Sequence, residues 1–305
     1  MVPFIARRSL QAIVVLFVVS LLAFVLIYLS GDPVLALVPI DARPEDIESV
    51  RRGFGLDQPI YVQYAKFVVR AVQGDLGESL KYRTNALELV MQRLPNTLTL
   101  AVSSIAIAIF VSFPLGIAAA TRRNGPIDAI ATGLSMLAIS TPSFWLGIVL
   151  ILLFADRFRV FPASGTGTLA HLVLPSLTLA APSIGLLTRL IRATMTDALR
   201  QDYVRTARAK GLRDWTVNLR HALRNCLIPL VTVLGLQFGA LLGGTVVVES
   251  VFSWPGLGWL LIQAINGRDL PLIRSAVLVI ATFFVVINLV VDVLYSYLDP
   301  RIRHA

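Results

Sequence analysis

The most densely charged segment of the sequence runs from Asp202 to Asn225 and is DYVRTARAKGLRDWTVNLRHALRN. It holds five arginines, one lysine, two aspartates and a histidine. Three small residues, Ala207, Ala209 and Gly211, lie between the charges. A guanidinium group forms directed hydrogen bonds with carboxylates, and small side chains let another surface come close. These residue types therefore favour recognition of another surface over bond breaking.

Patterns for catalysis and metal binding are missing from the sequence. It contains no GxxxxGK[ST] phosphate loop, no HExxH and no GxSxG, so it carries no Walker-type ATPase site and no familiar hydrolase site. Three scattered histidines and one cysteine, Cys226, argue against a metal site and exclude an internal disulfide. We interpret His171 as an interfacial residue and His221 as part of the charged segment, and we expect no catalytic residue.

The composition indicates a membrane protein. Hydrophobic residues make up 56% of the chain and charged residues 15%, whereas about a quarter of the residues in a soluble domain are charged. A membrane-spanning helix needs about 20 apolar residues. Six stretches qualify: residues 10–29, 98–120, 130–154, 172–190, 228–248 and 276–298. The predicted fold class is an all-α polytopic membrane protein with six transmembrane helices.

The first apolar stretch follows Arg7 and Arg8, as in a signal peptide, but lacks a small-x-small cleavage signal. We interpret it as a retained span. Prolines occur inside several spans and are expected to kink them, either for ordinary packing or to shape a bundle around a pathway. These prolines are Pro114, Pro142, Pro175 and Pro182.

The distribution of lysine and arginine predicts the orientation. With the N-terminus inside, the cytoplasmic segments hold 15 basic and five acidic residues, and the outer segments hold 12 of each. Basic residues concentrate on the cytoplasmic side of membrane proteins, so both termini are predicted to be cytoplasmic. Asp292 is the one acid within a span. Snorkelling or pairing with a loop arginine accounts for Asp292, and a functional role stays open.

Three parts follow from these spans: a first transmembrane helix at residues 1–30, an extracytoplasmic helical segment at 31–97, and a five-helix core at 98–305 with a cytoplasmic loop at about 191–227. In the outer segment we expect three amphipathic helices, which pack on the bundle or dock an external partner. They cover residues 44–52, 59–73 and 85–94, the last ended by Pro95. The second is expected to carry one apolar face, made by Ile60, Tyr64, Phe67, Val68 and Ala71. Near a smaller outer loop, Trp254 and Trp259 suit the membrane interface.

The charged segment is predicted to be a helix, a glycine turn and a second helix. Val204, Ala207 and Gly211 fall on one helix face, whereas Arg205 and Arg208 share another. Glycine at 211 ends or turns the helix at little steric cost. Apolar residues then recur every four positions in a helix that runs almost to residue 229. These residues are Trp215, Leu219 and Leu223.

Charge alone leaves two interpretations of this segment open. It is either a solvated inner loop that contacts anionic lipid, or a docking segment for a partner. A nucleic-acid partner is not expected, because nothing else in the chain supports one.

The stretch RTARAKGL, residues 205–212, resembles the "EAA" loop of ABC importer permeases, in which Glu-Ala-Ala is followed by three residues and a glycine. Gly211 stands in the glycine position, and Arg205 replaces the glutamate. The downstream stretch RHALRNCLIP, residues 220–229, resembles the dipeptide/oligopeptide/nickel branch of this family, with Arg224 where the wider family often has proline.

The resemblance to this branch covers nearly the whole chain. It includes the first span, the Gly31-Asp32-Pro33 sequence that follows it, and a series of motifs whose order and spacing match those of the branch. These are RRGFGLDQPIYVQY at 51–64, GDLGESL at 74–80, RLPNTLTLA at 93–101, STPSFWLGIVL at 140–150, LPSLTLA at 174–180 and VESVFSWPGLGWLL at 248–261.

The resemblance implies the permease subunit of an ATP-driven importer. Such a chain forms the pathway for a peptide-class substrate that an extracytoplasmic binding protein delivers, beside a second related permease and two cytoplasmic ATPases, in a bacterial-type inner membrane. It holds no cofactor, since ATP and Mg belong to the ATPases. The charged loop would be the coupling helix that docks on an ATPase. The expected coupling residues are Tyr203, Val204, Arg205, Thr206, Ala207, Arg208, Ala209, Lys210, Gly211 and Leu212.

Two other classes compete with this interpretation. An autonomous channel or secondary carrier has a similar composition. A proton-coupled carrier is expected to contain several intramembrane acids or histidines, and this sequence offers one, Asp292. A membrane-embedded hydrolase needs a nucleophile–base pair, and none is evident. The identity of the substrate is not encoded in readable form.

Overall fold

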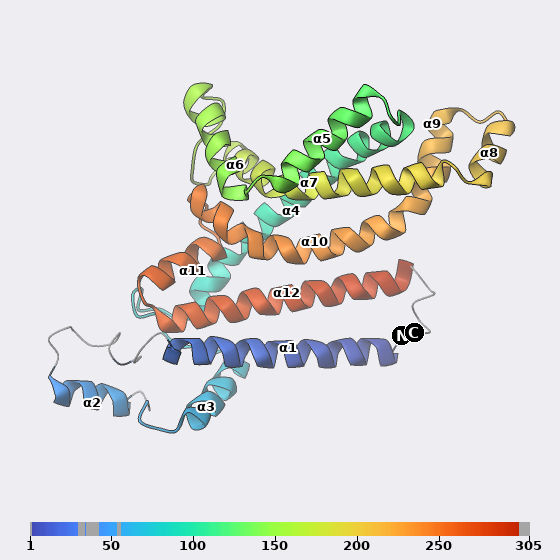
Figure 1. Ribbon diagram of the computed structural model, residues 1–305. Helices are drawn as coiled ribbons and strands as arrows, with labels where there is room; N and C mark the ends of the chain where they lie inside the picture. The colour runs from blue at the N-terminus through green and yellow to red at the C-terminus, as the bar shows by residue number, and fades with distance from the viewer. Residues whose placement is uncertain (1, 30–33, 35–42, 54–55, 299–305) are drawn as a thin grey trace. The chain divides into compact units, whose positions relative to one another are not determined.

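The computed structural model describes residues 2–29, 34, 43–53 and 56–298 (Figure 1). Helices dominate this part of the chain, and among its residues the only β pairing is an isolated bridge between Glu78 and Asn85. The all-α prediction is therefore confirmed for the described residues.

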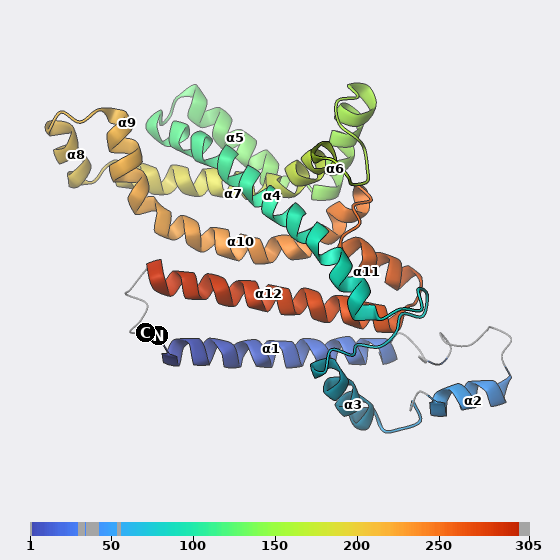
Figure 2. The ribbon, with the colours of Figure 1, turned by 180° about the vertical axis from the view of Figure 1, so that it is seen from behind.

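The labels of Figures 1 and 2 give the order of the helices along the chain. Two stretches are π-helical, here η2 and η3. The elements are α1 (Val2–Leu29), α2 (Pro44–Gly53), α3 (Ile60–Val72), α4 (Ala86–Thr121), α5 (Pro126–Ser140), α6 (Ser143–Leu150), η2 (Ile151–Arg157), α7 (Leu169–Ala198), α8 (Asp202–Ala209), α9 (Asp214–Thr216), η3 (Val217–Ala222), α10 (Leu223–Val251), α11 (Leu257–Asn266) and α12 (Leu270–Leu298).

Four described helices are long and apolar enough to cross a membrane, and the number rises to six if each of two bent pairs counts as one span. The four are Arg7–Val25, Ala86–Thr121, Leu169–Ala198 and Leu270–Val291. The expected span over residues 130–154 is not a continuous helix, because α5 and α6 meet at an angle of 107°. Pro142 excludes helical geometry at Thr141, whose backbone is extended, with φ −82° and ψ 122°. The predicted kink is therefore a break.

The chain divides into two compact units. The first unit comprises Met1–Thr97 and Pro255–Leu289, and the second comprises Leu98–Trp254 and Val290–Ala305. Both units are thus assembled from segments distant in sequence.

In the first unit, α3 packs on α1 as the amphipathic pattern predicts. Phe67 of α3 and Phe24 of α1 are buried, and the ring of Tyr64 lies edge-on to Phe24 with a centroid distance of 5.4 Å. Tyr64 also shares a 2.8 Å hydrogen bond with the hydroxyl of Ser20. Ile60, expected on the same apolar face, is 54% exposed, so the packed face begins one turn later.

The prediction that Pro95 ends a third outer helix is wrong. Helix α4 runs without interruption from Ala86 to Thr121. Val90 and Leu94 before the proline, and Leu100 after it, are all buried. Apolar packing on both sides of the proline outweighs its unfavourable helix propensity.

A buried carboxylate closes the loop that precedes α4. Asp269, fully buried before α12, accepts a 2.5 Å hydrogen bond from the hydroxyl of Ser79 and a bond from the backbone N–H of Lys81. It also accepts the N–H of Leu272 at the start of α12. Helix ends offer such unpaired N–H groups, and an aspartate here satisfies one of them.

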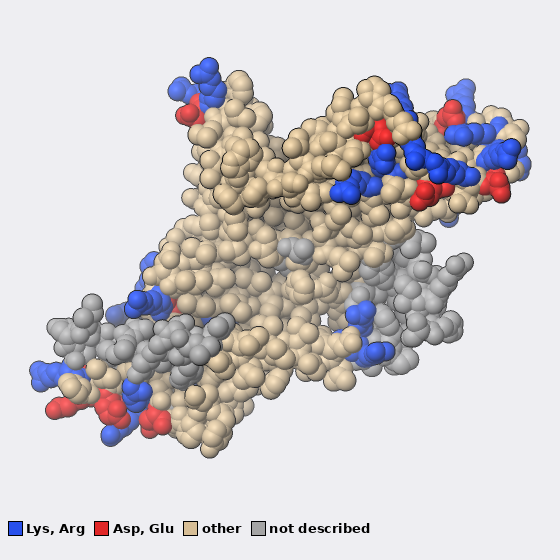
Figure 3. Space-filling model, viewed as in Figure 1, with Lys and Arg blue, Asp and Glu red and all other residues tan. Residues whose placement is uncertain are grey.

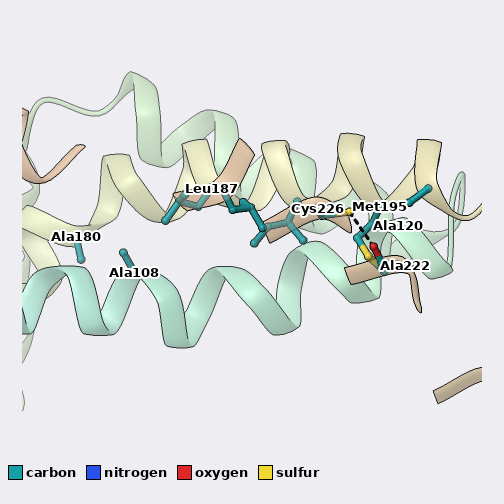
Figure 4. Packing of buried hydrophobic residues seen from close by; sticks show 10 residues of the cluster. Ala108, Ala120, Ala180, Leu187, Met195, Ala222 and Cys226 are labelled. Atoms are coloured by element: carbon teal, nitrogen blue, oxygen red, sulfur yellow. Dashed lines mark hydrogen bonds between the residues drawn. The ribbon is translucent and has the colours of Figure 1, made fainter. Parts of the chain in front are cut away.

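The core of the second unit lies between α4, α7 and α10. Figure 4 shows apolar side chains of these helices pointing toward one another, with Leu187 and Met195 of α7 fully buried. A second cluster contains Leu100, Phe252 and Trp254. Trp254 is only 5% exposed, so its predicted place in the interfacial belt is wrong: its ring fills this core.

Candidate functional site

The charged segment forms a helical hairpin beyond the ends of α7 and α10 (Figure 1). Its first arm is α8, and its second arm is α9, which continues through η3 into α10. Val204 and Ala207 of α8 are buried and pack against Val217 of η3 and Leu199 of the preceding link. The predicted small face thus exists, but the chain's own side chains cover it.

The turn between the two arms requires glycine. Gly211 has φ +77°, a left-handed conformation that L-residues with a Cβ adopt at a cost. Its N–H donates to the carbonyl of Arg208 (2.9 Å), and the N–H of Leu212 donates to the carbonyl of Ala207 (3.3 Å). This pair of bonds is the Schellman arrangement, which satisfies two carbonyls at the helix end. The predicted helix–glycine–helix order is confirmed.

An ion pair ties the two arms across the turn. Nε of Arg208 lies 3.3 Å from Oδ1 of Asp214. Both side chains are well exposed, so solvent screens the pair and it adds little stability. The glycine turn and the buried face therefore set the shape of the hairpin.

The expected apolar stripe over residues 215, 219 and 223 is not one face. Trp215 is 72% exposed, whereas Leu223 packs against the core of α4, α7 and α10. The π-helical segment η3 lies between them. A π turn contains an extra residue, which shifts the register and separates residues that an α-helix would align.

The outward surface of the hairpin is basic and also exposes three apolar side chains. Tyr203 and Leu212 are 38% and 39% exposed, and Trp215 is 72% exposed. Figure 3 shows Lys and Arg gathered over the end of the molecule that α8 and α9 form. The exposed basic residues there are Arg205, Arg208, Lys210 and Arg213.

Eight of the ten expected coupling residues are exposed, and Val204 and Ala207 are the two buried ones. Trp215 was not predicted to be a surface residue. Its place two residues after Arg213, directly after a charged turn, could have indicated exposure, but the four-residue spacing favoured an apolar stripe. We call Tyr203, Leu212 and Trp215 the exposed apolar residues of the hairpin.

Other candidate residues have local roles. The imidazole Nδ1 of His171 shares a 2.8 Å hydrogen bond with the hydroxyl of Thr168 before α7. No group of three or more His, Cys, Asp or Glu side chains within the described residues could hold a metal ion. The side chain of Asp292 lies outside the described part of the chain.

These features define a polytopic helical membrane protein with a structured basic hairpin between two apolar helices. Its fold is similar to solved ABC transporters. A structure of inward-facing conformations of the MetNI methionine ABC transporter matches with a TM-score of 0.56 and 16% identity, over 69% of this chain and 96% of that chain. An amino acid ABC transporter with histidines matches with a TM-score of 0.51 and 20% identity, over 70% and 94%. At these identities the likeness concerns the fold alone.

Sequence comparison gives the family. Residues 112–304 match the binding-protein-dependent transport system inner membrane component, and residues 1–101 match the N-terminal part of such membrane components. The chain is 43% identical to the glutathione transport system permease protein GsiC of Escherichia coli O6:H1, and 42% identical to that of strain K12 and of Shigella dysenteriae, each over 100% of both chains. The chain belongs to the family of binding-protein-dependent transport system inner membrane components. It is the permease subunit of an ABC importer.

Proposed function

We propose that this permease forms part of the pathway for a peptide-class substrate, delivered by an extracytoplasmic binding protein. Its whole-length relatives are named as glutathione transport permeases, and glutathione is a tripeptide. The substrate class of such an importer is expected to depend largely on its binding protein. We therefore assign a class of short peptides and leave the individual peptide open.

The proposed arrangement in a bacterial-type inner membrane has six spans and cytoplasmic termini. Each bent pair of helices counts as one span, with the outer segment at residues 31–97, the permease core at 98–305 and the cytoplasmic loop at about 191–227. The excess of 15 basic over five acidic residues on the assigned inner side supports this orientation. It places the hairpin of α8 and α9 in the cytoplasm.

The hairpin is the proposed docking site for a cytoplasmic ATPase, over residues 203–212 with the addition of Trp215. The observation that carries this proposal is the exposure of Trp215, 72%, in α9, directly after a glycine turn that carries exposed basic residues. Exposed aromatic anchors with basic neighbours are typical of protein interfaces. ATP and Mg would be bound by two such ATPases, and a second related permease would complete the membrane part.

Binding of the partner ATPase to the detergent-solubilised permease tests this proposal. Trp215→Ala is expected to weaken binding by about 30-fold, corresponding to roughly 2 kcal/mol for the loss of an aromatic anchor. Phe158→Ala is the matched control, because Phe158 is 63% exposed on the loop after η2. Equal binding by both variants would refute the assignment of Trp215.

An autonomous channel or secondary carrier is the competing function. Such a protein would move substrate without any ATPase. Substrate flux into vesicles that contain the permease pair alone would support it, and ATP-dependent flux in the full complex would exclude it.

A further inference from the structure

An ion pair with a buried carboxylate joins α5 to α7 near the hairpin. Asp128, in the first turn of α5, is 4% exposed. Its carboxylate accepts hydrogen bonds from both Nε and Nη2 of Arg192 on α7, the second at 2.8 Å. The backbone N–H of Asn124 (2.9 Å) and the hydroxyl of Thr132 (3.4 Å) complete its surroundings. Every side of this carboxylate is thus occupied by a donor of its own unit.

Arg192 lies on the part of α7 that leads into the hairpin. It precedes the end of α7 at Ala198 by six residues, or about 9 Å of helix. Residues 199–201 then connect α7 to α8. Leu199 in this link packs against both the main core and the buried face of α8. The hairpin is therefore packed directly onto the end of α7.

A second contact holds α5 and α7 together further along. A Cβ placed at Gly185 would lie 2.5 Å from the carbonyl oxygen of Ser135, so the two backbones are in direct contact there. Gly185 and Arg192 are seven residues apart, about 10 Å along α7. Two fixed points at this separation prevent α5 from sliding or rotating against α7.

The energetics favour a positioning role for the ion pair. The Asp128 carboxylate loses its hydration, whereas the Arg192 side chain stays 32% exposed, so desolvation on one side and solvent screening on the other leave the pair little net stability. The bidentate geometry does fix the relative direction of two helices. The apolar contacts and the close approach at Gly185 already hold α5 on α7, whereas the ion pair adds a directional restraint at the hairpin end.

We propose that Asp128 and Arg192 are positioning residues that carry movement of the hairpin through α7 to α5 and the broken span. This inference rests on the proposed function of the hairpin. Neither residue belongs to the proposed docking residues, 203–212 and Trp215, so the pair acts after the ATPase has docked. Loss of the ion pair would leave ATPase docking intact, but movement of the hairpin would no longer reach the transport pathway.

The test uses the full importer in proteoliposomes and three readouts: ATPase binding, the rate of ATP hydrolysis, and substrate transported per ATP. Asp128→Asn and Arg192→Lys are expected to bind the ATPase as the unaltered chain does and to hydrolyse ATP within about twofold, while transport per ATP falls by about tenfold. Ser103→Ala is the control, because it removes a 2.6 Å hydroxyl contact between α4 and α7 and leaves α5 untouched.

The outcomes separate the two proposals. Unchanged transport per ATP in Arg192→Lys and Asp128→Asn would overturn the positioning role. A loss of transport that is fully explained by a smaller amount of folded complex would also overturn it. If one of the two variants does not assemble, the other decides, since Asp128→Asn keeps the size of its side chain and Arg192→Lys keeps its charge. Failure of the unaltered permease to bind any ATPase would instead refute the proposed function.

Discussion

Replacement of Gly211 by alanine should impair docking through backbone strain alone. Gly211 has φ +77°, and a Cβ there would meet nothing within 4 Å. Alanine therefore adds no clash with a neighbouring element. It does place a Cβ in the left-handed region at the turn that precedes Leu212 and Trp215.

The structure sets the size of this effect. An L-residue in the left-handed conformation costs roughly 1–2 kcal/mol relative to glycine. If the whole strain is relieved by opening of the turn, the ratio of closed to open turn falls by about 5- to 30-fold, and this is the largest loss of apparent ATPase affinity that the strain can cause. Asparagine tolerates this region better, so Gly211→Asn should lose less affinity than Gly211→Ala.

Equilibrium binding of the ATPase to each purified variant measures the effect. Gly53→Ala is the matched control: its Cβ would also meet nothing within 4 Å, but Gly53 ends α2 without a positive φ. Its ATPase affinity should not change. Equal affinities of Gly211→Ala and Gly53→Ala, or a greater loss for Gly211→Asn than for Gly211→Ala, would refute the strain argument.

Two further predictions concern packing. Ala207→Glu should sharply lower the yield of folded permease, because it buries a charge in the hairpin's apolar cluster. Ala209→Glu, on the exposed side of α8, should not lower it. Size-exclusion chromatography compares the two yields, and equal yields would contradict the burial of Ala207. Phe67→Ala should destabilise the first unit by about 3 kcal/mol. Ile60→Ala, at a site 54% exposed, should be nearly neutral. Similar thermal unfolding midpoints for the two variants would contradict the packing of α3 on α1.

The predictions that succeeded depend on composition and local geometry. Apolar length located the four spans that are single helices among the described residues, because the bilayer core imposes a minimum helix length. The pattern of Tyr64 and Phe67 located the packed face of α3, because helical periodicity is a property of the nearby sequence. Gly211 was identified as a turn for the same reason, since few residues other than glycine adopt its backbone conformation.

The predictions that failed depend on contacts distant in sequence. Pro95 lies inside α4 because buried side chains on both sides support the helix. Trp215 and Leu223 lie on different faces because the π-helical segment between them shifts the register. The partners Asp128 and Arg192 are 64 residues apart, and the sequence shows each only as a charge at the inner end of a span. No local pattern pairs them.

Uptake of a labelled peptide into proteoliposomes tests the central claim most directly. The liposomes hold the full importer with its binding protein, and the permease is either unaltered or Trp215→Ala. The account predicts ATP-dependent uptake by the unaltered permease and its loss, in proportion to lost ATPase binding, in the variant. Equal uptake with and without ATP would contradict the account. ATP-dependent uptake that is the same for Trp215→Ala and the unaltered permease would also contradict it.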